Sequence, residues 1–329
     1  MKHRQLGQTD LTASVVSMGC WAIVGDETWG PQDEAESIAT IRASLEAGVT
    51  TFDTAEAYGQ GTSEILLGRA LAGRRHEAVI ASKVSGRNLS AEAVRQACER
   101  SLERLQTDYI DLYQIHWPSR ITPLAETMAA LEELRQEGKV RAIGVCNFGP
   151  ADLADLRAVG RCATNQLPYS PLWRAIEYEI QSRCLDAGIG ILCYSPLAQG
   201  LLTGKFSTAA EVPDGRARTR LFSGTRAQAR HGEAGCEVEA FAAIARVRQI
   251  SAALGQPMAQ VALAWLLHQP GVTSVIAGAR RPEQIRETAQ AAELELPPGI
   301  VRALSDATAE VKRAVGPNPD MWQAESRFR

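Results

Sequence analysis

Short apolar runs alternate along the chain with longer segments whose apolar residues recur every three or four positions. The short runs predict strands over residues 15–19, 49–52, 78–82, 109–115, 141–145, 163–167, 190–194 and 273–276. The longer segments predict helices over residues 33–47, 63–71, 90–105, 123–137 and 176–187. Strands that alternate with helices indicate a parallel sheet, and eight such units favour a closed barrel over an open sheet.

Helix start and stop signals support these boundaries. Ser90 stands at an N-cap position, Pro123 in a first turn, and Gly48, Gly138 and Gly188 follow the last periodic residues of three segments. The predicted fold is therefore an α/β protein, a (β/α)8 TIM barrel. Residues 1–329 suit one such domain, since these barrels typically need about 250 residues and accept insertions.

Three segments do not follow the alternation. The first dozen residues predict a hairpin that turns around residues 7–10, at the N-terminus. A long loop follows the seventh strand over residues 205–237 and carries five arginines, which suggests a lid or binding loop. A C-terminal tail after Ala314 contains prolines that exclude a regular helix, and we expect its Trp322 to dock on the barrel's own mouth, although a surface-packed tail is an equal alternative.

Composition narrows the classes of partner. A formal net charge of -3 gives no reason to expect nucleic acid or an anionic membrane, and no apolar run approaches the length of a membrane span. The seven cysteines are scattered without a C-x-x-C spacing, which suits reduced thiols in a cytoplasm. The first ten residues lack the apolar region of a signal peptide, so we expect a cytoplasmic protein of undetermined oligomeric state.

Candidate chemistry lies at the ends of three consecutive predicted strands. Asp53 ends the second strand, Lys83 the third and His116 the fourth, while Tyr58 follows just beyond Asp53. Alone, the aspartate reads equally well as a turn cap and the histidine better as a satisfied core residue. Together they favour an active site, because polar residues at strand C-termini of a barrel meet at one face. Pairing with Lys83 is expected to lower the pKa of Tyr58 and make it a proton donor near neutral pH.

Four motifs occur in an order and spacing that resemble the aldo-keto reductase family. They are Phe-Asp-Thr-Ala-Glu-Ala-Tyr-Gly at 52–59, Ser-Lys at 82–83, Asp-Tyr-Ile-Asp-Leu-Tyr-Gln-Ile-His-Trp-Pro at 108–118 and Gly-Val-Cys-Asn-Phe at 144–148. The resemblance extends over roughly the first 300 residues. It looks closest to bacterial NADP-dependent oxidoreductases related to the potassium-channel β-subunits, and it implies that the hairpin caps the barrel bottom.

The resemblance implies a catalytic tetrad at Asp53, Tyr58, Lys83 and His116. Tyr58 would protonate or deprotonate the reacting oxygen, Lys83 and Asp53 would tune it, and His116 would orient the carbonyl. The substrate would be a small carbonyl compound or alcohol. The expected pocket walls are Trp21, Trp29, Tyr58, His116 and Trp117, together with the 205–237 loop and the tail.

The resemblance also implies bound NADPH or NADP+. The expected cofactor contacts are Gly19, Trp21, Asp53, Asn147, Gln166, Tyr194, Ser195, Leu197, Gly200, Lys205, Gly278, Arg280, Gln284 and Glu287. Within this set, amides would bond the nicotinamide carboxamide, Tyr194 would stack on the ring, and residues 200–205 would wrap the pyrophosphate. Arg280, beside a helix N-terminus, would bind the adenosine 2'-phosphate and so favour NADPH over NADH.

Other interpretations explain less of the sequence. A dinucleotide-binding open sheet needs a third glycine where the chain has Glu64. A metal site is not expected, because the five histidines show neither an H-x-H nor an H-E-x-x-H spacing. A barrel isomerase explains only the anion site after the eighth strand. A nucleotide-sensing regulatory subunit on the same barrel remains an alternative to catalysis.

Overall fold

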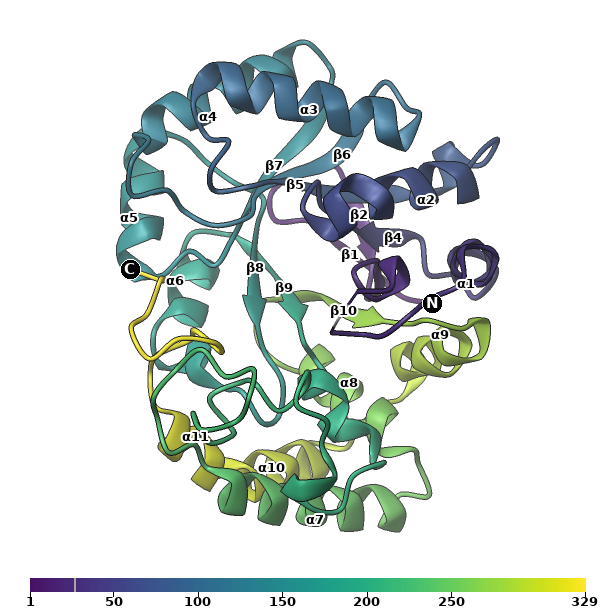
Figure 1. Ribbon diagram of the computed structural model, residues 1–329, viewed down its shortest axis with the longest axis vertical. Coiled ribbons are helices and arrows are strands. Elements are labelled where there is room, and N and C mark those ends of the chain that lie inside the picture. The colour runs from purple at the N-terminus through teal and green to yellow at the C-terminus, as the bar shows by residue number, and fades with distance from the viewer. Residues whose placement is uncertain (27) are drawn as a thin grey trace.

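Eight parallel strands form a closed barrel in the computed structural model, which describes residues 1–26 and 28–329 (Figure 1). The strand order around the barrel is β10-β3-β4-β5-β6-β7-β8-β9. The strands are β3 (Val16–Gly19), β4 (Thr51–Asp53), β5 (Val79–Val84), β6 (Ile110–Ile115), β7 (Val140–Cys146), β8 (Thr164–Pro168), β9 (Gly190–Tyr194) and β10 (Val272–Gly278). The predicted (β/α)8 barrel is confirmed, with each predicted strand overlapping an observed one.

Helices surround the strands. They are α1 (Glu34–Glu46), α2 (Thr62–Ala70), α3 (Ala91–Leu105), α4 (Leu124–Gln136), α5 (Pro150–Val159), α6 (Ile180–Asp186), α7 (Glu237–Ala253), α8 (Met258–Leu267), α9 (Pro282–Ala289), α10 (Pro298–Ala307) and α11 (Ala309–Val315). The single helix predicted over 176–187 is wrong. A short 3-10 turn (Ala175–Tyr178) comes first, and Glu179, at φ -153°, interrupts the helical path before α6.

The N-terminal hairpin closes the bottom of the barrel, as expected. Strands β1 (His3–Gln5) and β2 (Thr12–Ser14) pair antiparallel, and Leu6 and Leu11 pack into an apolar cluster with residues inside the barrel. The turn passes so close to the start of β8 that a Cβ on Gly7 would meet the carbonyl oxygen of Ala163 at 2.2 Å. Gly7 also has φ +55°, so this position requires glycine.

The long loop after β9 holds the start of the C-terminal tail. Arg220 is buried, and its Nε donates to Glu233 at 2.7 Å. Its Nη1 donates to the carbonyl oxygens of Asn318 at 3.0 Å and Asp320 at 3.2 Å. One arginine therefore joins the loop to the tail through main-chain oxygens, which any tail sequence would present.

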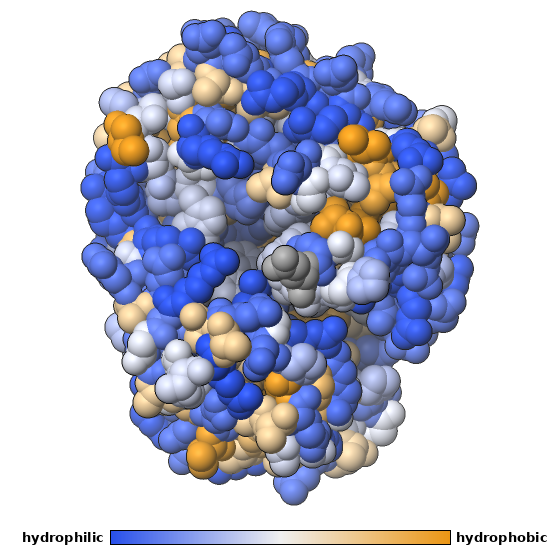
Figure 2. Space-filling model, viewed as in Figure 1, coloured by the Kyte–Doolittle hydropathy of each residue, from blue (hydrophilic) through white to orange (hydrophobic). Residues whose placement is uncertain are grey.

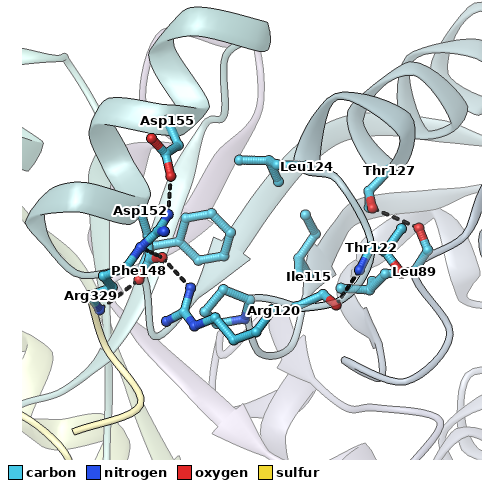
Figure 3. A pocket seen from close by; sticks show the side chains of 12 residues that line it. Leu89, Ile115, Arg120, Thr122, Leu124, Thr127, Phe148, Asp152, Asp155 and Arg329 are labelled. Carbon is cyan, nitrogen blue, oxygen red and sulfur yellow. Dashed lines mark hydrogen bonds and ion pairs between the residues drawn. The ribbon is translucent and has the colours of Figure 1, made fainter.

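The far end of the tail is fixed to α5. The main-chain oxygen of Arg329 accepts from the amides of Ala151 at 2.7 Å and Asp152 at 3.0 Å. Figure 3 shows the side chain of Arg329 directed toward Asp152 and Asp155, with Arg120 bonded to Asp152 from the opposite side at 2.6 Å. The tail, yellow in Figure 1, therefore runs from α11 to α5, held at both ends.

No single helix in the described part of the chain is long and apolar enough to cross a membrane. Helices α7 and α8 pass that test of length and composition only as a pair, and the pair bends by 95°.

Candidate active site

The carboxyl ends of neighbouring strands bring the four predicted catalytic side chains together. Asp53 is the last residue of β4, Lys83 lies near the end of β5, and His116 directly follows β6. Tyr58 begins a 3-10 turn (Tyr58–Gly61) a few residues beyond Asp53. Since the strands are parallel and adjacent, these ends meet at one edge of the barrel.

Lys83 is the centre of the group and is fully buried. Its Nζ donates to Asp53 Oδ1 at 2.6 Å, to the carbonyl oxygen of Thr54 at 2.8 Å and to the Tyr58 hydroxyl oxygen at 3.1 Å. The three ammonium protons are thus all used. Because the tyrosine oxygen accepts from Lys83, the hydroxyl's own proton is available to a ligand.

The acid-base properties of Tyr58 differ from the expectation. Burial raises the pKa of Tyr58 to about 12, and the opposing effect of Lys83 is smaller. The prediction that Lys83 brings the Tyr58 pKa below its ordinary value is therefore wrong for this structure, because the desolvation of the phenolate outweighs the nearby cation. Tyr58 keeps its proton at neutral pH, which suits an acid more than a base.

His116 faces Tyr58 across the same edge. The two rings lie 5.8 Å apart between centroids and nearly perpendicular, at 82°. Burial, and after it Lys83, lowers the pKa of His116 to about 3. The imidazole is therefore neutral at physiological pH, so one ring nitrogen carries a proton and the other accepts.

The pKa of His116 predicts a loss of stability in mild acid. The unfolded chain binds a proton on His116 below about pH 6.5, whereas the folded chain does not until about pH 3. Lowering the pH from 7.5 to 5 should therefore reduce the free energy of unfolding, with His116 contributing on the order of 1 kcal/mol. Urea unfolding at both pH values should show a smaller drop in His116→Gln than in wild type. An equal drop in both proteins would contradict the neutral, buried imidazole.

A cavity of about 770 Å³ opens above these residues. Figure 2 shows the molecule hollowed near the centre of this face, with mostly hydrophilic residues around the hollow. Its lining includes nearly all the predicted residues: Gly19, Trp21, Trp29, Asp53, Tyr58, His116, Trp117, Asn147, Gln166, Tyr194, Ser195, Leu197, Gly200, Lys205, Gly278, Arg280 and Gln284. Lys83 lies beneath the floor, behind Tyr58. Glu287 is also outside the lining, because it is exposed on α9.

The aromatic wall that the sequence predicted is assembled around Trp21. Its ring stacks on Tyr58 at 5.9 Å and 19° and meets Trp29 edge-on at 5.6 Å. The indole nitrogen donates to Asp26 Oδ2 at 2.8 Å, which fixes the orientation of the ring. Trp117 completes the opposite side, with the guanidinium of Arg327 from the tail 3.7 Å above its ring.

Two of the side-chain amides that were predicted to contact the cofactor form hydrogen bonds within the protein. Asn147 Nδ2 donates to the carbonyl oxygen of His116 at 3.0 Å, and its Oδ1 accepts from the Tyr194 hydroxyl at 3.0 Å. Gln166 Nε2 donates to Asp53 Oδ2 at 2.6 Å. Asn147 also has φ 64°, in the left-handed region that asparagine adopts more readily than most residues. Gln166 therefore supports Asp53, and Asn147 joins His116 to Tyr194, while both amides also line the cavity.

The segment after β9 forms a cradle at the other end of the cavity. Ser195, Ala198 and Gln199 have positive φ angles without being glycine, and Gly200 follows at φ 91°. Gln199 was not predicted, although its amide lines the cavity and its buried Oε1 has no partner in the described residues. Strained backbone with an unsatisfied buried acceptor indicates a place where a ligand completes the structure.

Cationic side chains lie beside this cradle. Lys205 and Arg216 line the cavity and form no ion pair within the part of the chain that the structure describes. Burial, and after it the neighbouring Arg216, lowers the pKa of Lys205. Burial followed by Arg280 likewise lowers the pKa of Arg216. A concentration of positive charge without carboxylates fits the phosphates of a nucleotide.

Arg280 was expected to be free for a phosphate, and the structure gives it other partners. Its guanidinium donates to Gln32 Oε1 at 2.7 Å, to the carbonyl oxygen of Trp29 at 2.5 Å and to that of Pro31. Gln284 Oε1 accepts from the amide of Arg280 at 2.8 Å and so caps α9. In this structure Arg280 fastens the loop before α1 over the cavity while still lining it.

Several cavity residues were missed in the sequence or known only as parts of segments. They are Ala22, Thr28, Ala57, Pro196, Gln199, Thr203, Arg216, Arg218, Gln228, Arg230, Ile276, Ala277, Gln323 and Arg327. Several of them lie in the 205–237 loop or the tail, which were expected to form walls of the pocket. Trp322 of the tail also lines the cavity, in agreement with the expectation that it docks on the barrel's mouth. No strand-end position marks Gln199 or Arg327, so no local pattern identifies them. Within the described residues, no three His, Cys, Asp or Glu side chains group as metal ligands.

The structure is a (β/α)8 barrel with a tyrosine, a buried lysine–aspartate pair and a histidine at the carboxyl ends of its strands. The sequence model of the Aldo/keto reductase family matches residues 15–308. The chain belongs to this family of oxidoreductases.

Three similar proteins illustrate the family. Aldo-keto reductase YhdN from Bacillus subtilis is 37% identical over 297 residues, covering 87% of each chain. An NADH-specific methylglyoxal reductase from Escherichia coli is 35% identical, covering 95% of this chain and 98% of its own. An aldo-keto reductase from Klebsiella pneumoniae, solved in complex with NADPH, is 29% identical with a TM-score of 0.73, covering 100% of this chain and 99% of its own.

Proposed function

We propose that the protein reduces an aldehyde or ketone to an alcohol with NADPH, and that it can run the reverse oxidation. The observation that carries the proposal is the Asp53–Lys83–Tyr58 unit at the floor of a cavity large enough for a nucleotide and a small substrate. The relatives support nicotinamide chemistry, since one is described as NADH-specific and another was solved with NADPH.

The cavity fits the cofactor at the end formed by the segment after β9. The unpartnered Gln199 Oε1, the cradle at Gly200 and the unpaired Lys205 and Arg216 would hold its phosphates. Tyr194, Asn147 and Gln166 would face the nicotinamide. When bound, the cofactor supplies a hydride to the carbonyl carbon and is oxidised to NADP+.

Tyr58 supplies the proton that balances this hydride. Its hydroxyl proton goes to the carbonyl oxygen, and Lys83, 3.1 Å from the tyrosine oxygen, stabilises the negative charge left behind. Asp53 neutralises Lys83 and holds it in place at 2.6 Å. Neutral His116 orients the carbonyl oxygen through a ring N–H. A proton from solvent restores Tyr58, so each turnover consumes one NADPH, one carbonyl compound and one proton.

Cofactor choice should depend on Arg280. We expect Arg280→Ala to raise the Kd for NADPH about tenfold or more, because a charge-assisted bond to the 2'-phosphate is lost. The Kd for NADH, which lacks that phosphate, should change much less. Nucleotide titrations at one fixed salt concentration would measure both constants.

The matched control is Gln32→Ala, which removes a contact of Arg280 with the loop but keeps the cation. Loosening that loop alone should affect the two nucleotides equally. Equal weakening in Arg280→Ala, or a wild type that prefers NADH, would show that Arg280 does not read the phosphate.

A panel of aldehydes and ketones, followed by NADPH and NADH absorbance in both directions, tests the proposal as a whole. We expect turnover with several aldehydes and faster reduction with NADPH. Nucleotide binding without turnover of any panel member would instead favour the nucleotide-sensing alternative. The proposal includes a cytoplasmic location, which the seven free thiols support.

A further inference from the structure

The five arginines of the 205–237 loop divide into two groups. Arg220 and Arg226 lie outside the cavity, and each pairs with a glutamate of the same region, at 2.7 Å and 3.2 Å. Arg216, Arg218 and Arg230 line the cavity, and none of them forms an ion pair within residues 1–26 and 28–329. The loop thus neutralises its structural arginines, and the others face the cavity without an ion-pair partner among the described residues.

The cavity arginines are themselves separated along its length. Arg216 lies at the cradle end, within electrostatic reach of Lys205 and Arg280. Arg218 lies at the Tyr58 end, its guanidinium carbon 5.6 Å from the Trp21 ring centroid. Trp21 in turn stacks directly on Tyr58. The nucleotide phosphates account for the first group of cations but not for Arg218.

Two aromatic rings hold Arg218 in place, but its buried Nε donor lacks a hydrogen-bond acceptor among the described residues. Its guanidinium lies between the ring of Trp21 and that of Trp322 from the tail, 4.9 Å from the latter. Its Nε is buried and has no hydrogen-bond partner among the described residues. A buried donor left without a partner is uncommon, and an acceptor on a ligand would satisfy it.

Among the described residues, the charges that face Arg218 are a second cation and a carboxylate that has other hydrogen-bond partners. Arg230 is a second cation on the same cavity wall, and burial together with Arg230 lowers the pKa of Arg218. Asp26 is the opposing carboxylate, but its oxygens already accept from the Trp21 indole and from the amides of Thr28 and Trp29.

We propose that the carbonyl substrate carries an anionic group, a carboxylate or a phosphate, which Arg218 binds with Arg230 while Tyr58 protonates the carbonyl oxygen. This inference rests on the proposed carbonyl reduction and specifies its substrate class. Arg218 and Tyr58 both lie against the ring of Trp21, so an anionic group and a carbonyl group of one small substrate can reach them together. Short-chain oxo acids and phosphorylated aldehydes therefore fit the site better than neutral aldehydes of equal size.

The test compares matched substrate pairs by the ratio of their kcat/KM values. The pairs are 4-oxobutanoate with butanal, and glyceraldehyde 3-phosphate with glyceraldehyde. Wild type should favour the anionic member of at least one pair by about tenfold or more, the scale of a charge-assisted bond. Whichever pair shows the preference identifies the anion as carboxylate or phosphate.

In Arg218→Gln the ratio should fall toward one, and Arg218→Lys should retain part of it. The matched control is Arg226→Gln, in the same loop but paired with Glu237, and it should keep the wild-type ratio. Nucleotide Kd values would confirm that each variant retains its folded cofactor site.

A wild-type ratio near one for both pairs, or a ratio unaffected by Arg218→Gln, would overturn the anion site while leaving carbonyl reduction intact. Failure to reduce any of the four compounds, with nucleotide binding preserved, would instead count against the proposed function and this inference together.

Discussion

Replacing Tyr58 by phenylalanine is expected to lower kcat for aldehyde reduction by a factor on the order of 10² or more, the scale of a lost general acid. The substitution removes one oxygen, which both accepts from Lys83 and carries a proton that faces the cavity. The Trp21 ring can still stack on phenylalanine, so the wall of the pocket should persist. Initial rates at saturating NADPH would measure the effect.

Two comparisons make that result specific. Tyr178→Phe removes the hydroxyl of an exposed tyrosine outside the cavity and should leave kcat near wild type. The Kd for NADPH should change little in Tyr58→Phe, since the proposed phosphate site lies at the other end of the cavity. Near-normal turnover in Tyr58→Phe would contradict the assignment of Tyr58 as the general acid.

Lys83→Met is expected to remove most activity, and adding Tyr58→Phe should lower kcat little further. The two residues share one hydrogen bond, and residues that act as a unit show strongly non-additive losses. Lys83→Met also leaves the Asp53 carboxylate buried without its cation, so the free energy of unfolding should fall by roughly 3–5 kcal/mol.

The double-mutant comparison separates these effects. Single and double variants are assayed below the temperature at which Lys83→Met begins to unfold, and circular dichroism confirms that each is folded. Losses of kcat that multiply in full would mean that Lys83 and Tyr58 work independently. That outcome would contradict the catalytic unit proposed here.

The part of the site that comes from strands could be predicted from the sequence. Asp53, Lys83 and His116 each end an apolar run, and the alternation of strands and helices places those ends at one edge of the barrel. Short local patterns were enough, because strands that follow one another in the sequence lie side by side in a parallel barrel.

The remainder of the site depends on contacts between distant segments. Arg218 and Trp322 meet where the loop lies against the tail, which Arg220 joins to the loop near Asn318. The hydrogen bond from Arg280 to Gln32, on the loop before α1, likewise depends on packing between the first and last barrel units. The pattern of apolar residues near these positions does not predict such contacts between distant segments.

The Tyr58 pKa shows a different limit. The sequence identified its cationic neighbour, Lys83, and so gave the sign of that one interaction correctly. The net shift depends on how deeply the hydroxyl is buried, which is set by the three-dimensional packing above β4 and β5. Burial is the larger effect, so reasoning from the charge alone gave the wrong direction.

The measurement that tests the central claim most directly follows a labelled hydride. NADPH carrying deuterium at nicotinamide C4, on the face transferred, is incubated with the protein and an aldehyde that it reduces, and the product is examined by NMR. We predict one deuterium on the former carbonyl carbon and an oxygen proton from water, with the product rate reduced about a hundredfold in Tyr58→Phe. Alcohol formed without the label, or formed equally fast in Tyr58→Phe, would contradict hydride transfer assisted by this tyrosine.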